Sequence, residues 1–370
     1  MKAIISGGGT GGHIFPAIAI ANALVRRHPD ADILFVGAEG RMEMEKVPAA
    51  GFRIEALPIA GLQRRLALSN LLVPFKMLKS QHKVRRILRE FCPDIVVGVG
   101  GYASAPTLRT AASMGFPTLL QEQNSYPGLT NKMLAAKAEK ICVAYEGMDH
   151  FFPVEKLVMT GNPVRADIEN ISVTRDEGRA FFGLEGDRPV VFSVGGSLGA
   201  GSINRMILSN INFFVEQRIR LIWQTGRSMY DEAVSAVKAQ GAEEWIAVQQ
   251  FVSRMDMAYA AADLIVSRAG AIAISELCLV GKPVVLIPSP NVAEDHQTKN
   301  AMALASQGAA LVVKDAECNV AGIDAIRRLL SDEASCKQMS HAILAMGKRG
   351  AADRIVDEID QLLDKRTSGK

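Results

Sequence analysis

Two glycine-rich stretches decide the fold: Ser6-Gly7-Gly8-Gly9-Thr10-Gly11-Gly12-His13 and Ser193-Val194-Gly195-Gly196-Ser197-Leu198-Gly199-Ala200. Each follows a short apolar run and precedes a helical pattern, so each is predicted to be a strand-to-helix turn. The first amides of a helix lack backbone partners and carry a partial positive charge, which suits a phosphate, and glycine allows close approach. One such turn in each half of the chain predicts two nucleotide-binding-type domains that face each other across a cleft.

The composition supports a two-domain globular protein. The 370 residues exceed one ordinary core, and 48% of them are hydrophobic and 22% charged. The net charge of +3 does not indicate a nucleic-acid partner. Five cysteines without metal-ligand spacing indicate free thiols in a reducing compartment. No signal peptide precedes the first expected strand, and no run reaches the roughly 18 apolar residues of a membrane span, so we expect an intracellular protein.

Apolar strands alternate with helical patterns along the chain, as in parallel α/β sheets that are covered on both faces. In the first half we expect strands near residues 2–6, 32–37, 94–99, 117–121, 140–144 and 156–160. In the second half we expect strands near residues 189–194, 220–225, 246–250, 263–267, 283–287 and 309–313. The predicted fold class is therefore α/β, with two Rossmann-like parallel-sheet domains.

The domain boundary is predicted at Gly161-Asn162-Pro163-Val164-Arg165, because a polar stretch of low periodicity follows at residues 167–177. The N-terminal domain then spans residues 1–163 and the C-terminal domain residues 164–348. A last helical pattern at about residues 349–366 has no strand after it. This helix could pack on either domain, and in two-domain enzymes of this kind it often crosses back to the first.

The first turn matches the dinucleotide fingerprint G-x-G-x-x-G at residues 7–12, which alone is a weak signal. That fingerprint also needs an acid at the end of the second strand, and the acids here lie at its start (Asp30 and Asp32) or beyond its end (Glu39). His13 lies in the first helical turn, beside the expected phosphate site. As a neutral imidazole it could take a proton from a sugar hydroxyl, and the alternative is a capping or packing histidine.

Other polar clusters follow predicted strands, at the edge where open parallel sheets bind ligands. These clusters are Gln121-Glu122-Gln123-Asn124, Ser267-Arg268-Ala269-Gly270-Ala271 and Glu294-Asp295-His296-Gln297-Thr298-Lys299-Asn300. Glu276, in the helix after the second cluster, could accept both hydroxyls of a ribose, unless it only stabilises the helix dipole. Solvated loop is the alternative for the first and third clusters.

A basic stretch at residues 62–89 contains eight Lys or Arg and no Asp or Glu, interleaved with leucines and other apolar residues. Such a segment indicates a surface that lies on anionic lipid, where each basic residue contributes about 1 kcal/mol. The alternative is a long helix whose apolar face belongs to the core. Nucleic acid is less favoured, because aromatic residues that could stack on bases are scarce here.

Several kinds of site are missing from the sequence. It has no Cys/His cluster, no G-x-S-x-G elbow and no Walker sequence, and its only D-x-D precedes a strand. We therefore expect neither a metal nor a cofactor, and metal-dependent hydrolysis and kinase chemistry are disfavoured.

Seven motifs together resemble the bacterial peptidoglycan N-acetylglucosaminyltransferases, which are GT-B glycosyltransferases. The motifs occur in that family's order at residues 8–13, 100–102, 121–124, 161–165, 195–200, 267–271 and 295–301. The match runs from residue 2 to about residue 310, and seven ordered motifs are far more specific than one glycine turn.

The resemblance implies a UDP-GlcNAc donor and, as acceptor, undecaprenyl-pyrophosphoryl-MurNAc-pentapeptide (lipid I). Transfer to the MurNAc 4-hydroxyl with inversion would give lipid II and UDP. The resemblance also implies a peripheral protein on the cytoplasmic face of the cell inner membrane, held there through residues 62–89, and cell-wall synthesis proteins as partners. The nearest rivals are other GT-B enzymes, such as a glycolipid glycosyltransferase or a UDP-GlcNAc epimerase. More distant ones are a nicotinamide-dependent dehydrogenase and a nucleotide-sugar binding module without catalysis.

The resemblance also assigns roles by position. Contacts with the donor sugar and diphosphate fall to Thr10, Gly11, Gly12 and Asn124, and contacts with uracil fall to Arg165 and the backbone at Val252. The remaining donor contacts are a phosphate at Ser197, the ribose at Glu276, and the GlcNAc hydroxyls at Gln297 with His296 beside it.

One motif departs from the family, in the helix segment Ala271-Ile272-Ala273-Ile274-Ser275 that leads to Glu276. Many relatives carry a hydroxyl residue where Ala273 stands, so only a backbone contact is expected there. The general base stays open between His13, the first choice, and Glu122, a carboxylate that burial could make more basic.

Overall fold

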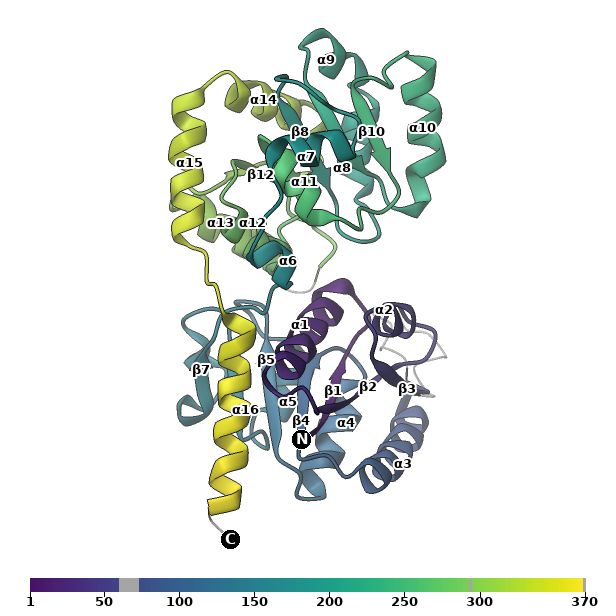
Figure 1. The fold of residues 1–370 in the computed structure, drawn as a ribbon, viewed down its shortest axis with the longest axis vertical. Coiled ribbons are helices and arrows are strands. Elements are labelled where there is room, and N and C mark those ends of the chain that lie inside the picture. The colour runs from purple at the N-terminus through teal and green to yellow at the C-terminus, as the bar shows by residue number, and fades with distance from the viewer. Residues whose placement is uncertain (60–72, 293–294, 369–370) are drawn as a thin grey trace. The chain divides into compact units, whose positions relative to one another are not determined.

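A computed structural model describes residues 1–59, 73–292 and 295–368 (Figure 1). The chain forms two compact units, the first made of Met1–Arg165 with Gly350–Lys370 and the second of Ala166–Arg349. Each unit is built on one sheet whose strand pairs are all parallel. The predicted α/β class with two parallel sheets is therefore confirmed.

The first unit holds a 7-stranded sheet in the order β3-β2-β1-β4-β5-β6-β7. Its strands are β1 (Lys2–Gly7), β2 (Asp32–Ala38), β3 (Arg53–Leu57), β4 (Ile95–Gly100), β5 (Thr118–Glu122), β6 (Lys140–Val143) and β7 (Leu157–Met159). Its helices are α1 (Gly11–Arg27), α2 (Glu43–Ala49), α3 (Val73–Phe91), α4 (Ser104–Ser113), α5 (Leu129–Leu134) and α16 (Ala351–Ser368), with short 3-10 turns at Met148–His150 and Val154–Lys156.

Strand β3 is absent from the sequence-based expectation. It lies at the edge of the sheet and pairs with β2 alone. Its sequence Arg53-Ile54-Glu55-Ala56-Leu57 carries two charges, and only Leu57 is buried. An edge strand needs no continuous apolar run, so the rule that found the buried strands missed this one.

Alternate residues of β1 belong to two separate hydrophobic cores, one on each face of the sheet. Ala3 and Ile5 pack with α1 and α16, whereas Ile4 packs on the opposite face with α3 and α4. On the first face, Ile355 and Ile359 of α16 are fully buried against α1, which lies beside α16 in Figure 1. The C-terminal helix thus contributes to the core of the first unit.

The second unit holds a 6-stranded sheet in the order β10-β9-β8-β11-β12-β13. Its strands are β8 (Val190–Val194), β9 (Arg220–Gln224), β10 (Ile246–Gln249), β11 (Leu264–Ser267), β12 (Val284–Leu286) and β13 (Leu311–Val312). Its helices are α6 (Ala166–Glu169), α7 (Arg175–Phe181), α8 (Gly201–Leu208), α9 (Ile211–Glu216), α10 (Tyr230–Ala239), α11 (Met255–Ala261), α12 (Ala271–Val280), α13 (His296–Ala305), α14 (Cys318–Leu330) and α15 (Glu333–Ala345), with 3-10 turns at Arg227–Met229 and Asp315–Glu317.

The stretch at residues 167–177 is more ordered than its polar composition suggests. It contains most of α6 and the start of α7, which Thr174 caps by accepting from the Glu177 amide while the Glu177 carboxylate accepts from the Thr174 amide. Such a reciprocal capping box stabilises a helix start without any apolar periodicity. The absence of periodicity therefore did not mean the absence of helix.

Ion pairs join α16 to the end of α1. Asp353, Asp357 and Asp360 pair with a basic cluster at the end of α1 that includes Arg26 and Arg27.

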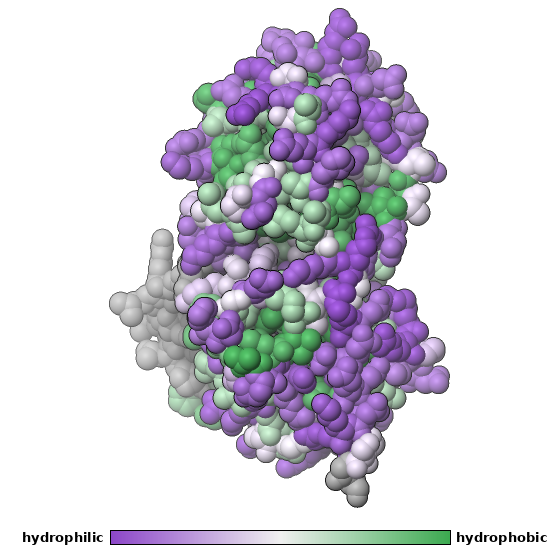
Figure 2. Space-filling model, turned by 90° about the vertical axis from the view of Figure 1, so that its left-hand side faces the viewer, coloured by the Kyte–Doolittle hydropathy of each residue, from purple (hydrophilic) through white to green (hydrophobic). Residues whose placement is uncertain are grey.

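Hydrophilic residues cover most of the molecular face in Figure 2, and apolar ones gather in separate patches. Within the described ranges, no helix has the length and apolar character to cross a bilayer.

Replacing Ile359 with alanine tests the contribution of α16. Because Ile359 is fully buried, Ile359→Ala should destabilise the first unit by about 2–5 kcal/mol. Both tryptophans, Trp223 and Trp245, belong to the second unit, so their fluorescence should keep its wild-type denaturant transition while the circular dichroism transition shifts. Lys365→Ala, at an exposed site on the same helix, is the matched control. A shift of the fluorescence transition alone would contradict this assignment of α16.

Candidate functional site

The glycine turn of the first unit ends at the start of α1. Thr10 is the N-cap residue with extended backbone, and its side chain makes no capping hydrogen bond. Thr10 and Gly12 are exposed and Gly11 is half-buried. The structure thus places Thr10, Gly11 and Gly12 together at the amino end of a 17-residue helix, where backbone amides can bind an anion.

His13 is held between this turn and the turn after β4. Its Nδ1 lies 3.4 Å from the hydroxyl oxygen of Thr10. Its ring packs so closely on Gly100 that a Cβ there would lie 2.8 Å from the His13 Cδ2 atom. A Cβ on Gly101 would in turn lie 2.3 Å from the carbonyl oxygen of Gly8. The two glycine turns therefore interlock, and together they fix the imidazole.

Glu122 ends β5 with its side chain 2% exposed. Its Oε1 accepts from the amide (3.0 Å) and the side-chain Nδ2 (3.1 Å) of Asn124. Its Oε2 accepts from the amide of Gly128 (3.1 Å) and the Nδ2 of Asn131 (2.9 Å). Both carboxylate oxygens are thus engaged, and they orient the half-buried Asn124 and the loop that leads to α5.

The neighbouring glutamines are structural in this chain. Gln121 donates to Asn162 (3.1 Å), Asn162 donates to the carbonyl oxygen of Gln123 (3.0 Å), and Gln123 donates to that of Val99 (2.8 Å). All three side chains are buried. Of the cluster 121–124, only the side chain of Asn124 is left in a position to meet a ligand.

Arg165 belongs to the first unit, whereas Val252, which was expected to share the uracil with it, belongs to the second. Its guanidinium is 5.4 Å from the ring centroid of Phe15 on α1. Val252 and Glu276 belong to the second unit.

In the second unit, the turn after β8 interlocks with the turn after β9. A Cβ on Gly199 would lie 2.0 Å from the carbonyl oxygen of Thr225, and one on Gly226 would lie 2.1 Å from that of Leu198. Ser197, half-buried, stands in the first of these turns. The arrangement repeats the close backbone contact found between the two turns of the first unit.

Gln224, which belongs to none of the sequence motifs, links this turn to the segment at Val252. Its side-chain nitrogen donates to the carbonyl oxygen of Gly196 (2.9 Å), and its side-chain oxygen accepts from the amide of Val252 (2.8 Å). Because that amide is engaged, a contact from Val252 to a uracil has to come from its carbonyl group. A glutamine at the end of an expected strand is the sequence signal for this role, and its burial is seen only in the structure.

The α12 segment starts one residue after Gly270 and carries Glu276 on its second turn. Glu276 is buried, and its Oε2 accepts from the hydroxyl of Tyr259 at 2.9 Å. The hydroxyl of Ser275 donates back to the carbonyl oxygen of Ala271 (2.9 Å). Ala271, Ile272 and Ile274 are buried, whereas Ala273 and Ser275 are half-buried.

Arg268 fixes the loop that precedes α12. Its guanidinium donates to Asp315 (2.5 Å), to the hydroxyl of Ser202 (2.8 Å) and to the carbonyl oxygen of Ile287 (2.8 Å). These partners come from the segments that follow β8, β12 and β13. The arginine therefore positions three loops at one end of the sheet, which a single motif in the sequence could not reveal.

His296 and Gln297 start α13, after Asp295 with a backbone φ of 52°. The side-chain oxygen of Gln297 accepts from the amide of Ser289 at 2.9 Å. His296 is half-buried beside it. The polar cluster expected at residues 294–300 lies partly outside the described residues, because Glu294 is not among them.

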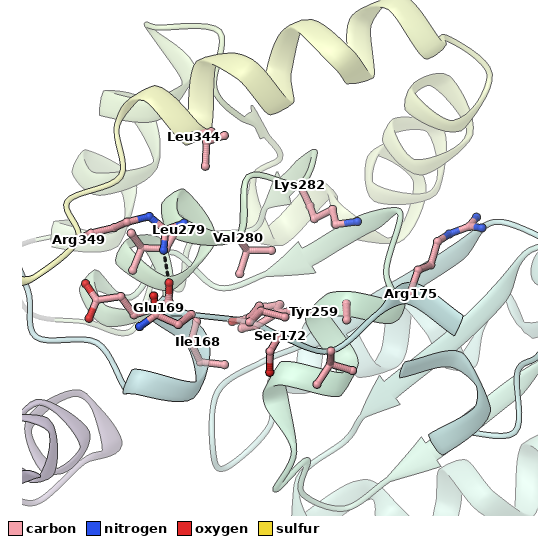
Figure 3. A pocket seen from close by; sticks show the side chains of 14 residues that line it. Ile168, Glu169, Ser172, Arg175, Tyr259, Leu279, Val280, Lys282, Leu344 and Arg349 are labelled. Carbon is pink, nitrogen blue, oxygen red and sulfur yellow. Dashed lines mark hydrogen bonds between the residues drawn. The ribbon is translucent and has the colours of Figure 1, made fainter. Parts of the chain in front are cut away.

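A cavity of about 680 Å³ lies in the second unit between the segment 168–173, α11 and α12 (Figure 3). Tyr259, whose hydroxyl donates to Glu276, is among its lining residues. Lys282 also lines it, and burial lowers the pKa of its ammonium group. Figure 3 shows Arg349 beside Glu169, whose carbonyl oxygen accepts from the arginine. None of the site residues expected from sequence lines this cavity.

Metal ligation was not expected from the sequence. No group of three or more His, Cys, Asp or Glu side chains that could hold a metal ion occurs in the described part of the chain.

Comparisons with known proteins cover nearly the whole chain. The glycosyltransferase family 28 N-terminal domain matches residues 3–143, and the corresponding C-terminal domain matches residues 190–355. In solved structures, the chain resembles Acinetobacter baumannii MurG, with 28% identity, a TM-score of 0.75, and coverage of 97% of this chain and 99% of that one. A UDP-N-acetylglucosamine 2-epimerase at 16% identity and a TM-score of 0.66 shares the fold alone.

Closer relatives carry one and the same name. The protein from Parabacteroides distasonis is 54% identical and covers 99% of each chain, and one from Porphyromonas gingivalis is 54% identical over 98% of this chain and 96% of its own. Both are named UDP-N-acetylglucosamine–N-acetylmuramyl-(pentapeptide) pyrophosphoryl-undecaprenol N-acetylglucosamine transferase. The chain therefore belongs to glycosyltransferase family 28, within its N-acetylglucosamine transferases of this name.

Proposed function

We propose that this protein transfers N-acetylglucosamine from UDP-GlcNAc to the MurNAc 4-hydroxyl of lipid I, with release of UDP and formation of lipid II. The observation that carries the proposal is the 54% identity, over 99% of both chains, to a relative named for this transfer. In our proposal the second unit holds the uridine and a phosphate, and the glycine turn of the first unit meets the reacting sugars.

The reaction needs a base and a stabilised leaving group. The 4-hydroxyl attacks C1 of GlcNAc from the face opposite UDP, the base takes its proton, and the C1–oxygen bond to UDP breaks with inversion. Amides at the turn around Ser197, before α8, can stabilise the negative charge that develops on the departing diphosphate. No metal is required where backbone amides supply this stabilisation.

We assign the base to His13 in preference to Glu122. His13 stands at the amino end of α1 beside the exposed Thr10, with its ring fixed by two turns. Both oxygens of Glu122 already accept hydrogen bonds, two from Asn124 and one each from Gly128 and Asn131. Glu122 is better suited to hold Asn124 in place for the donor sugar than to accept a proton from the acceptor.

The donor site in our proposal combines residues from separate elements of the second unit. Glu276 would accept from the ribose hydroxyls while Tyr259 holds its other side, and the Val252 carbonyl would meet the uracil. Gln297 and His296 would contact the GlcNAc hydroxyls. Arg165, whose guanidinium packs on Phe15 of α1, would also meet the uracil.

We also propose that α3 contacts the cytoplasmic face of the inner membrane as a peripheral surface. Phe75 (72% exposed) and Leu78 (64% exposed) stand among the exposed Lys76 and Lys79, a combination that suits an anionic bilayer. Lys83 is different, because it donates to the carbonyl oxygen of Ala56. Residues 62–72 of the basic stretch lie outside the described residues. Docking of cell-wall synthesis proteins stays a prediction.

Replacing His13 tests its role as base. His13→Ala should lower kcat by roughly 10²–10⁴-fold, because a positioned proton acceptor contributes about that much. UDP affinity should stay near the wild-type value, since His13 is not among the proposed UDP contacts. Transfer of labelled GlcNAc to a short-chain lipid I analogue measures kcat, and calorimetry measures UDP binding. His341→Ala, on the exposed side of α15, is the control. Undiminished turnover would remove His13 from this role.

Replacing Glu276 tests the donor site. Glu276→Ala should weaken UDP binding by about 1–3 kcal/mol, or about 5- to 150-fold in Kd, because hydrogen bonds from the ribose to a carboxylate are lost. The measurement is titration of UDP against the purified protein. Glu333→Ala, on exposed surface of α15, should leave Kd unchanged. Equal Kd values for Glu276→Ala and the wild type would argue against a ribose contact.

A further inference from the structure

Glu43 is a fully buried acid that the proposed mechanism does not use. It is the first residue of α2 and is 0% exposed. Its Oε2 accepts from the amide of Gly9 at 2.9 Å, and its Oε1 accepts from the amide of Ala38 at 3.0 Å. A buried carboxylate is costly to desolvate, so both bonds matter to its placement.

The Glu43 carboxylate fits only because the residues around it are glycines, which have no Cβ atom. A Cβ on Gly8 would lie 2.2 Å from Glu43 Oε1, and a Cβ on Gly37 would lie 2.6 Å from Glu43 Cγ. Gly37 belongs to β2, and Gly8 to the turn after β1. The side chain is therefore enclosed between the end of β2 and the glycine turn.

This placement sets the geometry of the turn. The Gly9 amide points toward Glu43 and is used there, so an incoming anion has to be met by amides closer to α1. The same turn continues through Thr10 to His13, and its other side contacts Gly101 through the Gly8 carbonyl oxygen. A contiguous set of contacts thus runs from the Glu43 carboxylate to the His13 imidazole.

We infer that Glu43 is a positioning residue of the transferase, which holds the turn at residues 8–10 so that His13 and the first amides of α1 are correctly placed. The inference rests on the proposed role of this turn in the reaction. It does not make Glu43 a proton donor or acceptor for the substrates. The sequence shows a glutamate after the second strand, but it does not show that this side chain points into the protein toward the glycine turn.

The test compares Glu43→Gln with Glu45→Gln. The amide of a glutamine side chain offers one acceptor and one donor, so one of the two backbone amides loses its acceptor. Glu45 stands two residues further along the same helix with its side chain 77% exposed, and it pairs with Lys46. Glu43→Gln should lower kcat by about 10²-fold, as expected for a misplacement of about 1 Å, with Kd for UDP unchanged. Glu45→Gln should change neither.

Amide hydrogen exchange provides a readout that does not depend on catalysis. In the unsubstituted protein the Gly9 and Ala38 amides should exchange more slowly than the amide of the exposed Gly40, and Glu43→Gln should speed exchange at Gly9 or Ala38. Fast exchange at both sites in the unsubstituted protein would overturn the inference, even if Glu43→Gln failed to fold. Wild-type kcat in a folded Glu43→Gln variant would overturn it as well.

A double variant separates this inference from the assignment of the base. If Glu43 acts through His13, the kcat losses of Glu43→Gln and His13→Ala should combine to less than their product. If His13→Ala keeps full turnover while Glu43→Gln loses it, the base assignment fails, and Glu43 still positions the turn. If Glu43→Gln alone keeps full turnover, the positioning role fails and His13 retains its assignment.

Discussion

Close backbone contact between neighbouring glycine turns is the constraint on which the candidate site residues of each unit depend. In the first unit, Gly101 has no room for a Cβ against Gly8, and in the second unit Gly226 has none against Leu198. Gly101 and Gly226 also have positive φ angles of 87° and 73°, which glycine adopts without strain. Each contact brings the turn after a central strand against the turn after its neighbour. The turn after the central strand precedes a helix in each unit, so the contact also sets where the first amides of that helix point.

Buried polar side chains also hold the loops at the carboxyl ends of the strands in place. Glu43, Glu122 and Gln224 each use both terminal atoms of the side chain to bind backbone or side-chain groups of loops at the carboxyl ends of the strands. Arg268 does the same for loops of the second unit. Thr10 and Asn124, which are proposed to touch substrate, are more exposed than these. Glu276 and Val252 differ, because both are buried and are also proposed to contact the nucleotide.

Sequence predicted the strands that are buried on both faces, because continuous Val/Ile/Leu runs bounded by glycine turns are typical of the central strands of parallel sheets. It missed β3, whose two charges suit a sheet edge, and the helical start at Thr174, which depends on a capping box. Motif order identified the family, which the comparisons confirm. It could not separate Gln121 and Gln123, which are buried and internally bonded, from Asn124, since the direction of a side chain depends on pairing between distant strands.

In the proposed reaction, each pair of interlocked turns serves one half of the chemistry. The most direct measurement compares Gly101→Ala with Gly226→Ala, with GlcNAc transfer to a lipid I analogue and UDP binding determined for both. Gly101→Ala should lose transfer and keep UDP binding, whereas Gly226→Ala should lose both. Transfer at the wild-type rate by Gly101→Ala, or loss of UDP binding in that variant with retention in Gly226→Ala, would rule out this division of roles.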